Sequence, residues 1–454
     1  MVAASPFQGL RFDPAVVGDP CRVIAPPYDV ITPEGRDAYE AMHPYNIVRL
    51  ILARGERDDP GRYTQVGKLL GSWCDEGALL LDATPSLYLY EEAYTVRGER
   101  RLLRGVLASV DLDDSGETVV PHERTMTAPV ADRLRLLEAT RTNLSPVFAV
   151  YAGAGRSEAA LGEVEATDAV VDCVDATGTG HRLWPISDPE RIAAWCQALA
   201  DQRVLIADGH HRYRTALAYR DSMRQAEAGR SGGPGGSRAR PRPRHQAAEQ
   251  SRAVAPRWIA APWEQTLMLL VDIDRHGPAV LAIHRLLAGV PAETVLQAVA
   301  RDFEARLLAS PLDLEVELER LPAEAIAYGL YGGGRSVLLV ARDPAALGAR
   351  TGLDHAPLDV EVLHGPVLAG LLGVHEPEGQ VAFESDLAEA VDQVDRGAWA
   401  SLIVLRPAPF PAVTDIAQRG RTLPPKTTFF YPKPRDGLVL RPLEPELFAR
   451  PPRG

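Results

Sequence analysis

Residues 204–220, VLIADGHHRYRTALAYR, place an acid, a glycine, two histidines and an arginine between an apolar run and a helical pattern. The apolar run 204–207 predicts a buried strand, and the spacing from residue 210 onward predicts a helix. Gly209 gives the backbone the freedom that a sharp turn needs, and Asp208 suits the cap of the helix. We therefore expect a strand–turn–helix unit here.

Such a junction is suited to an anion, most simply a phosphate. The first turn of a helix has backbone N–H groups without intrahelical partners, and it is the positive end of the helix dipole. The side chains that add donors or positive charge close to this end are His210, His211, Arg212 and Arg214. Gly209 lets the backbone approach the ligand, and Asp208 is a candidate ligand for a magnesium ion that neutralises the phosphates.

A second group of candidate residues lies in PHERTMTAPVADR, residues 121–133. His122 and Glu123 end a predicted strand, and Arg133 lies early in the next predicted helix. Glu123 is the candidate general base toward an alcohol, with His122 beside it, and Arg133 is a candidate phosphate clamp. The alternative is that Glu123 forms an ordinary ion pair with Arg124 or Arg133.

Lysine is scarce in this sequence, and two of its three lysines lie in PPKTTFFYPKP, residues 424–434. Because lysine and arginine differ in shape and hydration, a local preference for lysine can mark a functional position. Lys426 is the candidate we select for binding phosphate, and Lys433 is the alternative. In APPYDVI, residues 25–31, Asp29 either faces a substrate ammonium group or belongs to a rigid structural loop.

The composition bounds the class of protein. The chain has 454 residues, of which 46% are hydrophobic and 24% charged, and its formal net charge is −12. These values favour two or three globular domains and disfavour binding to nucleic acid or to a membrane surface. The N-terminus does not have the pattern of a signal peptide, and no apolar run is long enough to span a bilayer. The four scattered cysteines predict reduced thiols in a cytosol, and we expect a cytoplasmic protein.

The order of strand-like and helical segments predicts an α+β fold with mixed sheets and flanking helices. A hairpin is expected around Arg97-Gly98. We divide the chain into an N-terminal α+β domain at 1–226, a flexible Arg/Gly/Pro-rich insertion at 227–256, and a C-terminal α+β region at 257–454 packed on the first.

Several segments resemble the bacterial and archaeal family called domain of unknown function 1015. They are FQGLRFDP (7–14), APPYDVI (25–31), PHERTM (121–126), DRLRLLEATRTNLSPVF (132–148), HRLW (181–184), ADGHHRYRTAL (207–217), PAVLAIHRLLAG (278–289) and KTTFFYPKPRDGLVLRPL (426–443). The DGHHR motif also resembles the ParB/sulfiredoxin-like fold, whose helix start binds nucleotide phosphates and which includes free-serine kinases. This resemblance implies ATP or ADP, with magnesium, and a small hydroxylated acceptor such as free serine.

The expected function is therefore a small-molecule kinase in which Glu123 takes the hydroxyl proton and the 208–212 junction holds the nucleotide. Two other functions stay open. One is a non-catalytic nucleotide-binding switch of the ParB type. The other is a metal-dependent hydrolase, with ligands drawn from His122, Glu123, Asp208, His210 and His211. Neighbouring histidines on a helix point about 100° apart, which disfavours one metal bound by both His210 and His211.

Overall fold

The computed structural model describes residues 1–56, 59, 61–122, 127–164, 168–231, 261–375, 379–421, 423–424 and 426–448. The chain divides into two compact units, each discontinuous in sequence. Unit 1 consists of Met1–Val119, Thr125–Gly277 and Lys433–Gly454, and unit 2 consists of Val120–Arg124 and Pro278–Pro432. Residues 261–277 and 433–448, expected in a C-terminal region, therefore belong to unit 1.

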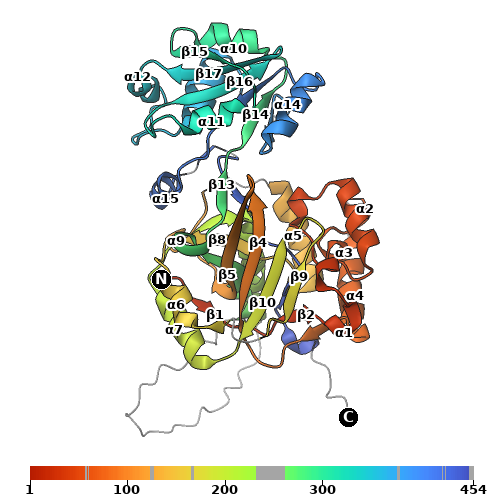
Figure 1. Ribbon diagram of the computed structural model, residues 1–454. Coiled ribbons are helices and arrows are strands. Elements are labelled where there is room, and N and C mark those ends of the chain that lie inside the picture. The colour runs from red at the N-terminus through yellow and green to blue at the C-terminus, as the bar shows by residue number, and fades with distance from the viewer. Residues whose placement is uncertain are drawn as a thin grey trace, which may run out of the picture. The chain divides into compact units, whose positions relative to one another are not determined.

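Unit 1 contains a large mixed sheet (Figure 1). Its strands, in order across the sheet, are β6 (Val119–Val120), β11 (Val204–Asp208), β8 (Val147–Tyr151), β12 (Gln265–Asp272), β5 (Glu99–Asp111), β4 (Leu87–Val96), β10 (Gly180–Ile186) and β9 (Val171–Val174). A short strand, β1 (Ala4–Ser5), pairs with β5. The pair β12–β8 is parallel, whereas β11–β8, β12–β5, β5–β4, β4–β10 and β10–β9 are antiparallel.

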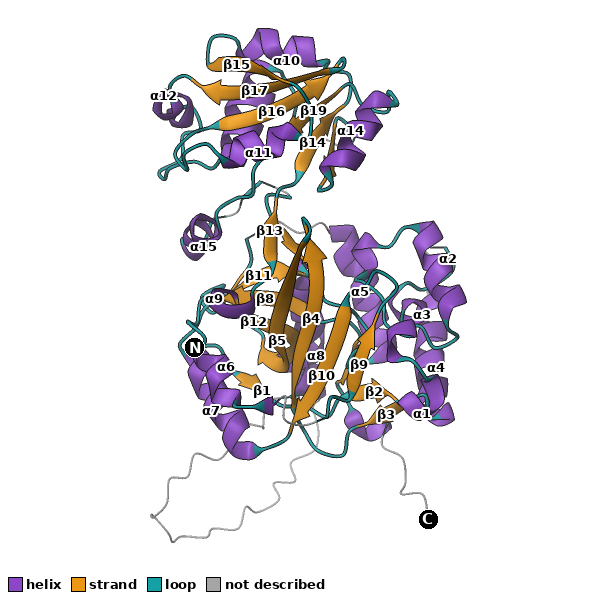
Figure 2. Cartoon of the chain, in the orientation of Figure 1, coloured by secondary structure: helices purple, strands orange, loops and turns teal. Residues whose placement is uncertain are grey.

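The helices of unit 1 are α1 (Pro14–Val17), α2 (Pro33–Met42), α3 (Val48–Ile51), α4 (Gly61–Glu76), α5 (Thr127–Thr140), α6 (Arg156–Leu161), α7 (Pro189–Ala200), α8 (His210–Ser231) and α9 (Ile273–His276). They include a group on the left of this sheet in Figure 2, around α6, α7 and α9, and a group on its right, around α1–α5. One apolar core joins the sheet to α6 and α7 through residues such as Trp195. A second core lies among α3, α4 and the short strands β2 (Leu10–Phe12) and β3 (Leu79–Leu81). The first core also includes Tyr213 and Leu217, which pack the first turns of α8 against the sheet.

The expected α+β class is confirmed, and so are two local predictions. Val96 pairs with Glu99 across the β4–β5 hairpin, and the two central turn residues have positive φ, 50° at Arg97 and 79° at Gly98. Positive φ at both positions gives the turn type that matches the twist of the strands. The strand–turn–helix unit is also present, because β11 ends at Asp208 and α8 begins at His210.

Helix α8 continues to Ser231, so residues 227–231 are helical rather than part of a flexible insertion. Residues 232–256 of the predicted insertion lie outside the described residues. In the described part of the chain, no helix combines the length and the apolarity needed to span a bilayer.

Unit 2 is a second α/β arrangement, with one fully antiparallel sheet. Its strands, in order, are β15 (Phe303–Leu308), β17 (Arg335–Ala341), β16 (Ala327–Gly332), β19 (Ser401–Val404), β14 (His284–Leu287) and β18 (Val381–Glu384). Its helices are α10 (Ala292–Val299), α11 (Asp313–Glu319), α12 (Pro344–Ala349), α13 (Asp359–Val362), the π-helix η5 (Leu363–Leu371), α14 (Leu387–Asp395) and α15 (Phe410–Gln418). A short pair, β13 (Ala279–Leu281) with β20 (Phe429–Tyr431), completes its strands.

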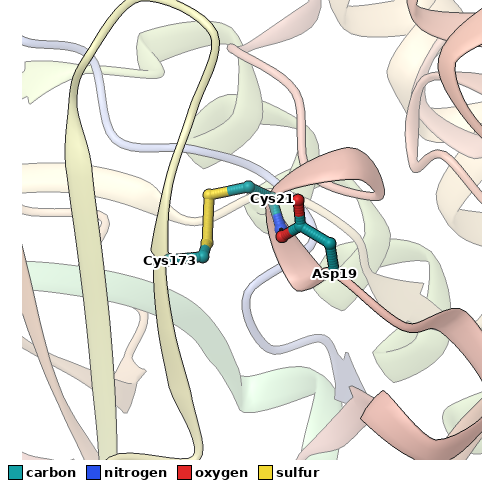
Figure 3. A group of neighbouring side chains, drawn as sticks. All are labelled: Asp19, Cys21 and Cys173. Atoms are coloured by element: carbon teal, nitrogen blue, oxygen red, sulfur yellow. A yellow bond between two sulfur atoms is a disulfide. The ribbon is translucent and has the colours of Figure 1, made fainter.

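The expectation of four reduced thiols is wrong. Cys21 and Cys173 form a disulfide with a Cα–Cα distance of 5.8 Å (Figure 3), whereas Cys74 and Cys196 are not disulfide-bonded within the described residues. The two bonded cysteines are 152 positions apart. Spacing along the sequence carries no information on such a contact, because the fold alone brings η1 (Pro20–Arg22) beside β9 within bonding distance.

Candidate functional site

The junction of β11 and α8 is built on a glycine with a left-handed backbone. Gly209 has φ +90°, and a Cβ atom at this position would lie 2.9 Å from Nε of Arg212. The register of β11 on β8 shifts between Ile206 and Asp208, which marks a bulge at the end of the strand. The bulge and the turn together direct Asp208 toward the first turn of α8, where Arg212 lies.

Asp208 binds two cations. One of its carboxylate oxygens accepts a hydrogen bond from a terminal nitrogen of Arg212, and the other lies 2.8 Å from Nζ of Lys433. The ammonium group of Lys433 also donates to Asp29, at 3.0 Å. The Asp208 and Lys433 side chains are 13% and 10% exposed. Such a bridge is much less screened by solvent than a surface ion pair.

These acids keep both cations charged. Burial lowers the pKa of Lys433, but the carboxylates of Asp208 and Asp29 outweigh it and leave the pKa above its ordinary value. Burial also lowers the pKa of Arg212, and the carboxylates of Asp208 and Asp436 more than compensate. The region therefore contains two permanent positive charges that are balanced locally by several acids.

Asp436 is a fully buried acid beside this cluster. Its Oδ2 accepts a hydrogen bond of 2.6 Å from the hydroxyl of Ser145, whereas its Oδ1 has no hydrogen-bond partner among the described residues. Burial raises the pKa of Asp436 to about 7, against the opposing effect of the Arg212 guanidinium. Asp436 therefore exchanges a proton near neutral pH, which is a useful property for an acid or base in catalysis.

A hollow of about 60 Å³ opens next to these residues. The residues that line it are Tyr28, Ile51, Arg133, Leu136, Leu137, Thr142, Asn143, Leu144, Ser145, Arg212, Thr215 and Thr266. One water molecule needs about 10–15 Å³ of such space, so the hollow admits a phosphate group or a small metabolite but not a whole nucleotide. Its wall is partly apolar and partly hydroxyl, amide and guanidinium.

Arg133 occupies one wall of the hollow. Its guanidinium lies 4.2 Å from the centre of the Tyr28 ring, donates to the carbonyl of Ile51 at 2.6 Å, and donates to Asp132 at 2.8 Å. These contacts fix its orientation. Burial and neighbouring charges raise the pKa of Tyr28 on balance, so its phenol stays protonated.

The remaining predicted residues lie in different places. His210 is buried, His211 is half-buried, and Arg214 is exposed on α8. Glu123 and Arg124 lie outside the described residues. His122 and Lys426 belong to unit 2.

Within unit 2, His122 is fully buried, and its Nε2 lies 3.1 Å from the hydroxyl of Thr428. Lys426 is exposed, has φ 56°, and accepts a hydrogen bond from Arg285 through its carbonyl. The predicted catalytic and phosphate-binding roles of both residues remain predictions.

The existing contacts of Asp208 limit how its carboxylate could bind a metal ion. Both of its carboxylate oxygens already contact cations, so magnesium would have to displace Lys433 or Arg212, or bind through water. Within the described residues, the one group of three metal-ligating side chains with donor atoms within 4.8 Å of one another is Asp19, Cys21 and Cys173, which does not include Asp208.

Sequence reasoning did not select Lys433, Ser145 or Asp436. The scarcity of lysine drew attention to both Lys426 and Lys433, but it could not tell which of them lies beside Asp208. Ser145 and Asp436 carry no local signal, because their pairing joins positions 291 residues apart. All three belong to segments that also carried the family resemblance.

A second polar network lies inside the sheet of unit 1. The hydroxyl of Tyr90 lies 2.9 Å from Glu92 and 2.8 Å from Nδ1 of His181, whose Nε2 lies 3.3 Å from Asp175. Asp175 accepts a 2.6 Å hydrogen bond from Arg435. Burial raises the pKa of Glu92 to about 8 and lowers the pKa of His181 to about 4. At neutral pH the network therefore holds a protonated Glu92 and a neutral His181.

Segment 433–436 connects the two networks. Lys433 contacts Asp29 and Asp208, Arg435 contacts Asp175, and Asp436 contacts Ser145. The backbone of Asp436 also pairs with Ala25. This segment belongs to the last sequence stretch of unit 1, and it contributes charged side chains to the candidate site.

A family model described as "Protein of unknown function (DUF1015)" matches residues 4–362. The chain belongs to this family. The resemblance of the segments between residues 7 and 289 to DUF1015 is thereby confirmed, whereas the ParB/sulfiredoxin-like character of the DGHHR motif remains a prediction. A search of the curated proteins finds no match.

Several solved structures resemble this DUF1015 protein at low similarity. A free serine kinase in complex with AMP is 14% identical with a TM-score of 0.33, over 72% of this chain and 86% of that chain. A conserved hypothetical protein from Pyrococcus furiosus is 15% identical with a TM-score of 0.33, over 75% and 96%. SbnI with C-terminal truncation, from Staphylococcus aureus, is 10% identical with a TM-score of 0.35, over 74% and 87%. Similarity at this level carries no inference about function.

Proposed function

We propose that this DUF1015 protein is a nucleotide-dependent kinase that phosphorylates a small hydroxylated metabolite, with free serine as the first acceptor to test. The observation that carries the proposal is the start of α8 at Gly209, where Arg212 lines a phosphate-sized hollow and shares the carboxylate of Asp208 with Lys433. Phosphoryl transfer depends mainly on positioning and on neutralising charge. A long helix with a glycine at its start and fixed cations nearby supplies both.

The acids of the cluster make magnesium part of the proposal. Asp29, Asp208 and ionised Asp436 oppose a bare polyphosphate, because they offset the charges of Arg212 and Lys433. A magnesium ion brought by ATP or ADP would reverse this balance. We therefore expect nucleotide to bind much more tightly with magnesium than without it.

Glu123 is the proposed general base, and the structure offers a second route for the hydroxyl proton. A hydroxyl in the hollow would lie beside Ser145, whose own proton is shared with Asp436. Asp436, with a pKa of about 7, would accept a proton passed on by Ser145. Transfer then forms a bond from the acceptor oxygen to the γ-phosphorus of ATP, or the β-phosphorus of ADP, and releases ADP or AMP.

The test combines binding with turnover. Calorimetry with ATP and with ADP, each with and without magnesium, measures binding, and transfer of labelled phosphate to L-serine measures turnover. Glu123→Gln should abolish transfer and spare nucleotide binding. If Glu123→Gln transfers phosphate at the wild-type rate, the role given to Glu123 is wrong. If magnesium nucleotide fails to bind the wild-type protein at all, the kinase proposal is wrong.

One outcome would favour the non-catalytic switch. Magnesium nucleotide would then bind, but a panel of hydroxylated acceptors would receive no phosphate. Deletion of residues 229–255 separates the two functions further. A kinase should keep its turnover after this deletion, whereas a switch that uses the Arg-rich segment to contact nucleic acid should lose its partner.

A further inference from the structure

The disulfide of unit 1 lies beside a carboxylate. The sulfur atoms of Cys21 and Cys173 and an oxygen of Asp19 all lie within 4.8 Å of one another (Figure 3). Once the disulfide is reduced, these residues offer two cysteine sulfurs and one carboxylate oxygen, and each of these atom types binds Zn²⁺ in proteins. The kinase proposal does not use these residues.

Local structure fixes all three positions. Asp19 is the N-cap of η1, and its carboxylate accepts the N–H of Cys21 at 2.9 Å. Cys21 is buried on η1, and Cys173 is half-buried on β9, where it pairs in register with His181 of β10. Asp19 is exposed. The group therefore sits on ordered backbone and opens to solvent on one side, so both a reductant and a metal ion can reach it.

We propose that Cys21, Cys173 and Asp19 form a redox-gated site for a thiophilic divalent cation such as Zn²⁺. In the oxidised state the disulfide leaves no thiolate, and the cation does not bind. A dithiol reductant supplies two electrons and two protons, breaks the S–S bond, and itself becomes a disulfide. Binding of the cation then releases the two thiol protons and forms two metal–sulfur bonds and one metal–oxygen bond.

The geometry suits this set of ligands. Tetrahedral zinc with Zn–S bonds of about 2.3 Å holds two thiolates about 3.8 Å apart. The two Cα atoms are 5.8 Å apart, so rotation of the cysteine side chains alone provides that separation. The two thiolates and the carboxylate carry three negative charges, and zinc reduces the total to one. Water takes the fourth position, because the three protein ligands leave it open to solvent.

The cation would preserve a cross-link that reduction removes. The disulfide ties η1 to β9, and both segments lead into the candidate site. Downstream of η1, Ala25 pairs with Asp436, and directly after β9, Asp175 contacts Arg435. The oxidised protein and the reduced, metal-bound protein therefore keep this tie, whereas the reduced, metal-free protein loses it.

The experiment uses the full-length protein and Co²⁺ as a spectroscopic stand-in for Zn²⁺. The protein is reduced with a phosphine, freed of reductant without exposure to air, and titrated with Co²⁺. We expect one equivalent to bind with a thiolate-to-metal charge-transfer band, and the oxidised protein to show none. Zn²⁺ should then displace Co²⁺ and raise the melting temperature of the reduced protein only.

Variants locate the site. Cys21→Ser and Cys173→Ser should each remove the band, and Asp19→Asn should weaken binding at least about tenfold, as loss of a metal-site partner does. Cys196→Ser is the matched control, since Cys196 is a half-buried free thiol elsewhere in unit 1, and it should leave the band intact. A reduced wild-type protein without the band overturns the proposal. So does a band that survives in Cys173→Ser or disappears in Cys196→Ser. None of these readouts depends on nucleotide binding.

Discussion

The ammonium group of Lys433 lies 3.0 Å from a carboxylate oxygen of Asp29, a residue 404 positions earlier in the chain. The same ammonium lies 2.8 Å from Asp208, at the end of the strand that leads into α8. One lysine therefore bridges two acids that come from separate segments. Because its side chain is 10% exposed, water cannot readily replace it.

We expect Lys433→Met to destabilise unit 1, because it leaves Asp29 and one carboxylate oxygen of Asp208 without the ammonium group that bridges them. Removing one partner of a buried ion pair costs about 3–5 kcal/mol. The lower end applies here, since Asp29 is 35% exposed and regains water. Urea unfolding of Lys68→Met provides the matched control, as Lys68 is exposed on α4 and should change little. Adding Asp208→Asn to Lys433→Met should restore part of the loss, and no restoration would argue against the bridge.

Gly209→Ala should destabilise the protein by about 1–3 kcal/mol, because its φ of +90° is strained for any residue with a Cβ atom. Arg212 would also have to move away from the new methyl group. Gly71→Ala, inside α4 with open space around it, should instead stabilise by about 0.5–1 kcal/mol. Thermal unfolding of both variants measures the contrast. Effects of the same sign would contradict this account of the junction.

Glu92→Gln should make stability less dependent on pH. Burial raises the pKa of Glu92 from 4.5 to about 8. The folded state therefore binds a proton that the unfolded state releases, and this stabilising contribution is complete below pH 4.5 and disappears as the pH rises to about 8. Glutamine has no such proton. As the pH rises from 4.5 to about 8, the free energy of unfolding of the variant should increase relative to that of the wild type. A difference between the two free energies that stays constant over this range would count against a protonated Glu92.

The pH profile of phosphate transfer should depend on Asp436 if Ser145 passes its proton there. Transfer should rise as Asp436 ionises, through a pH of about 7. Asp436→Asn should lower the rate of transfer and remove this limb of the profile. Ser145→Ala should lower the rate of transfer about 100-fold or more, the usual range for lost acid–base catalysis. Magnesium-nucleotide binding, measured by calorimetry, should persist in Ser145→Ala. An unchanged limb in Asp436→Asn would assign the proton to another group, with Glu123 the next candidate.

Local chemistry made part of the fold predictable. The run 204–207 followed by Gly209 and a helical pattern predicted the junction, because strand, turn and helix preferences all act over a few residues. The same reason applies to the hairpin at Arg97-Gly98. No local sequence pattern indicated that Cys173 is bonded to Cys21, because β9 and η1 are brought together by the packing of unit 1 as a whole.

Only the part of the candidate site that lies within residues 208–212 was predictable from the sequence. Asp208, Gly209 and Arg212 are close in sequence, so their chemistry could be read together. Lys433 and Asp436 enter from a segment that the chain reaches only after unit 2. Deciding which of Lys426 and Lys433 lies beside Asp208 therefore required information about tertiary structure that the residue types do not contain.

The interleaving of the two units has a consequence for biosynthesis. Segment 433–436 supplies the cation between Asp29 and Asp208, and it leaves the ribosome only after all of unit 2 has been translated. Through that interval Asp29 and Asp208 lack the ammonium group that bridges them, although Asp208 can already pair with Arg212. A nascent chain stalled within unit 2 is therefore expected to be a substrate for chaperones and proteases rather than a half-finished but stable domain.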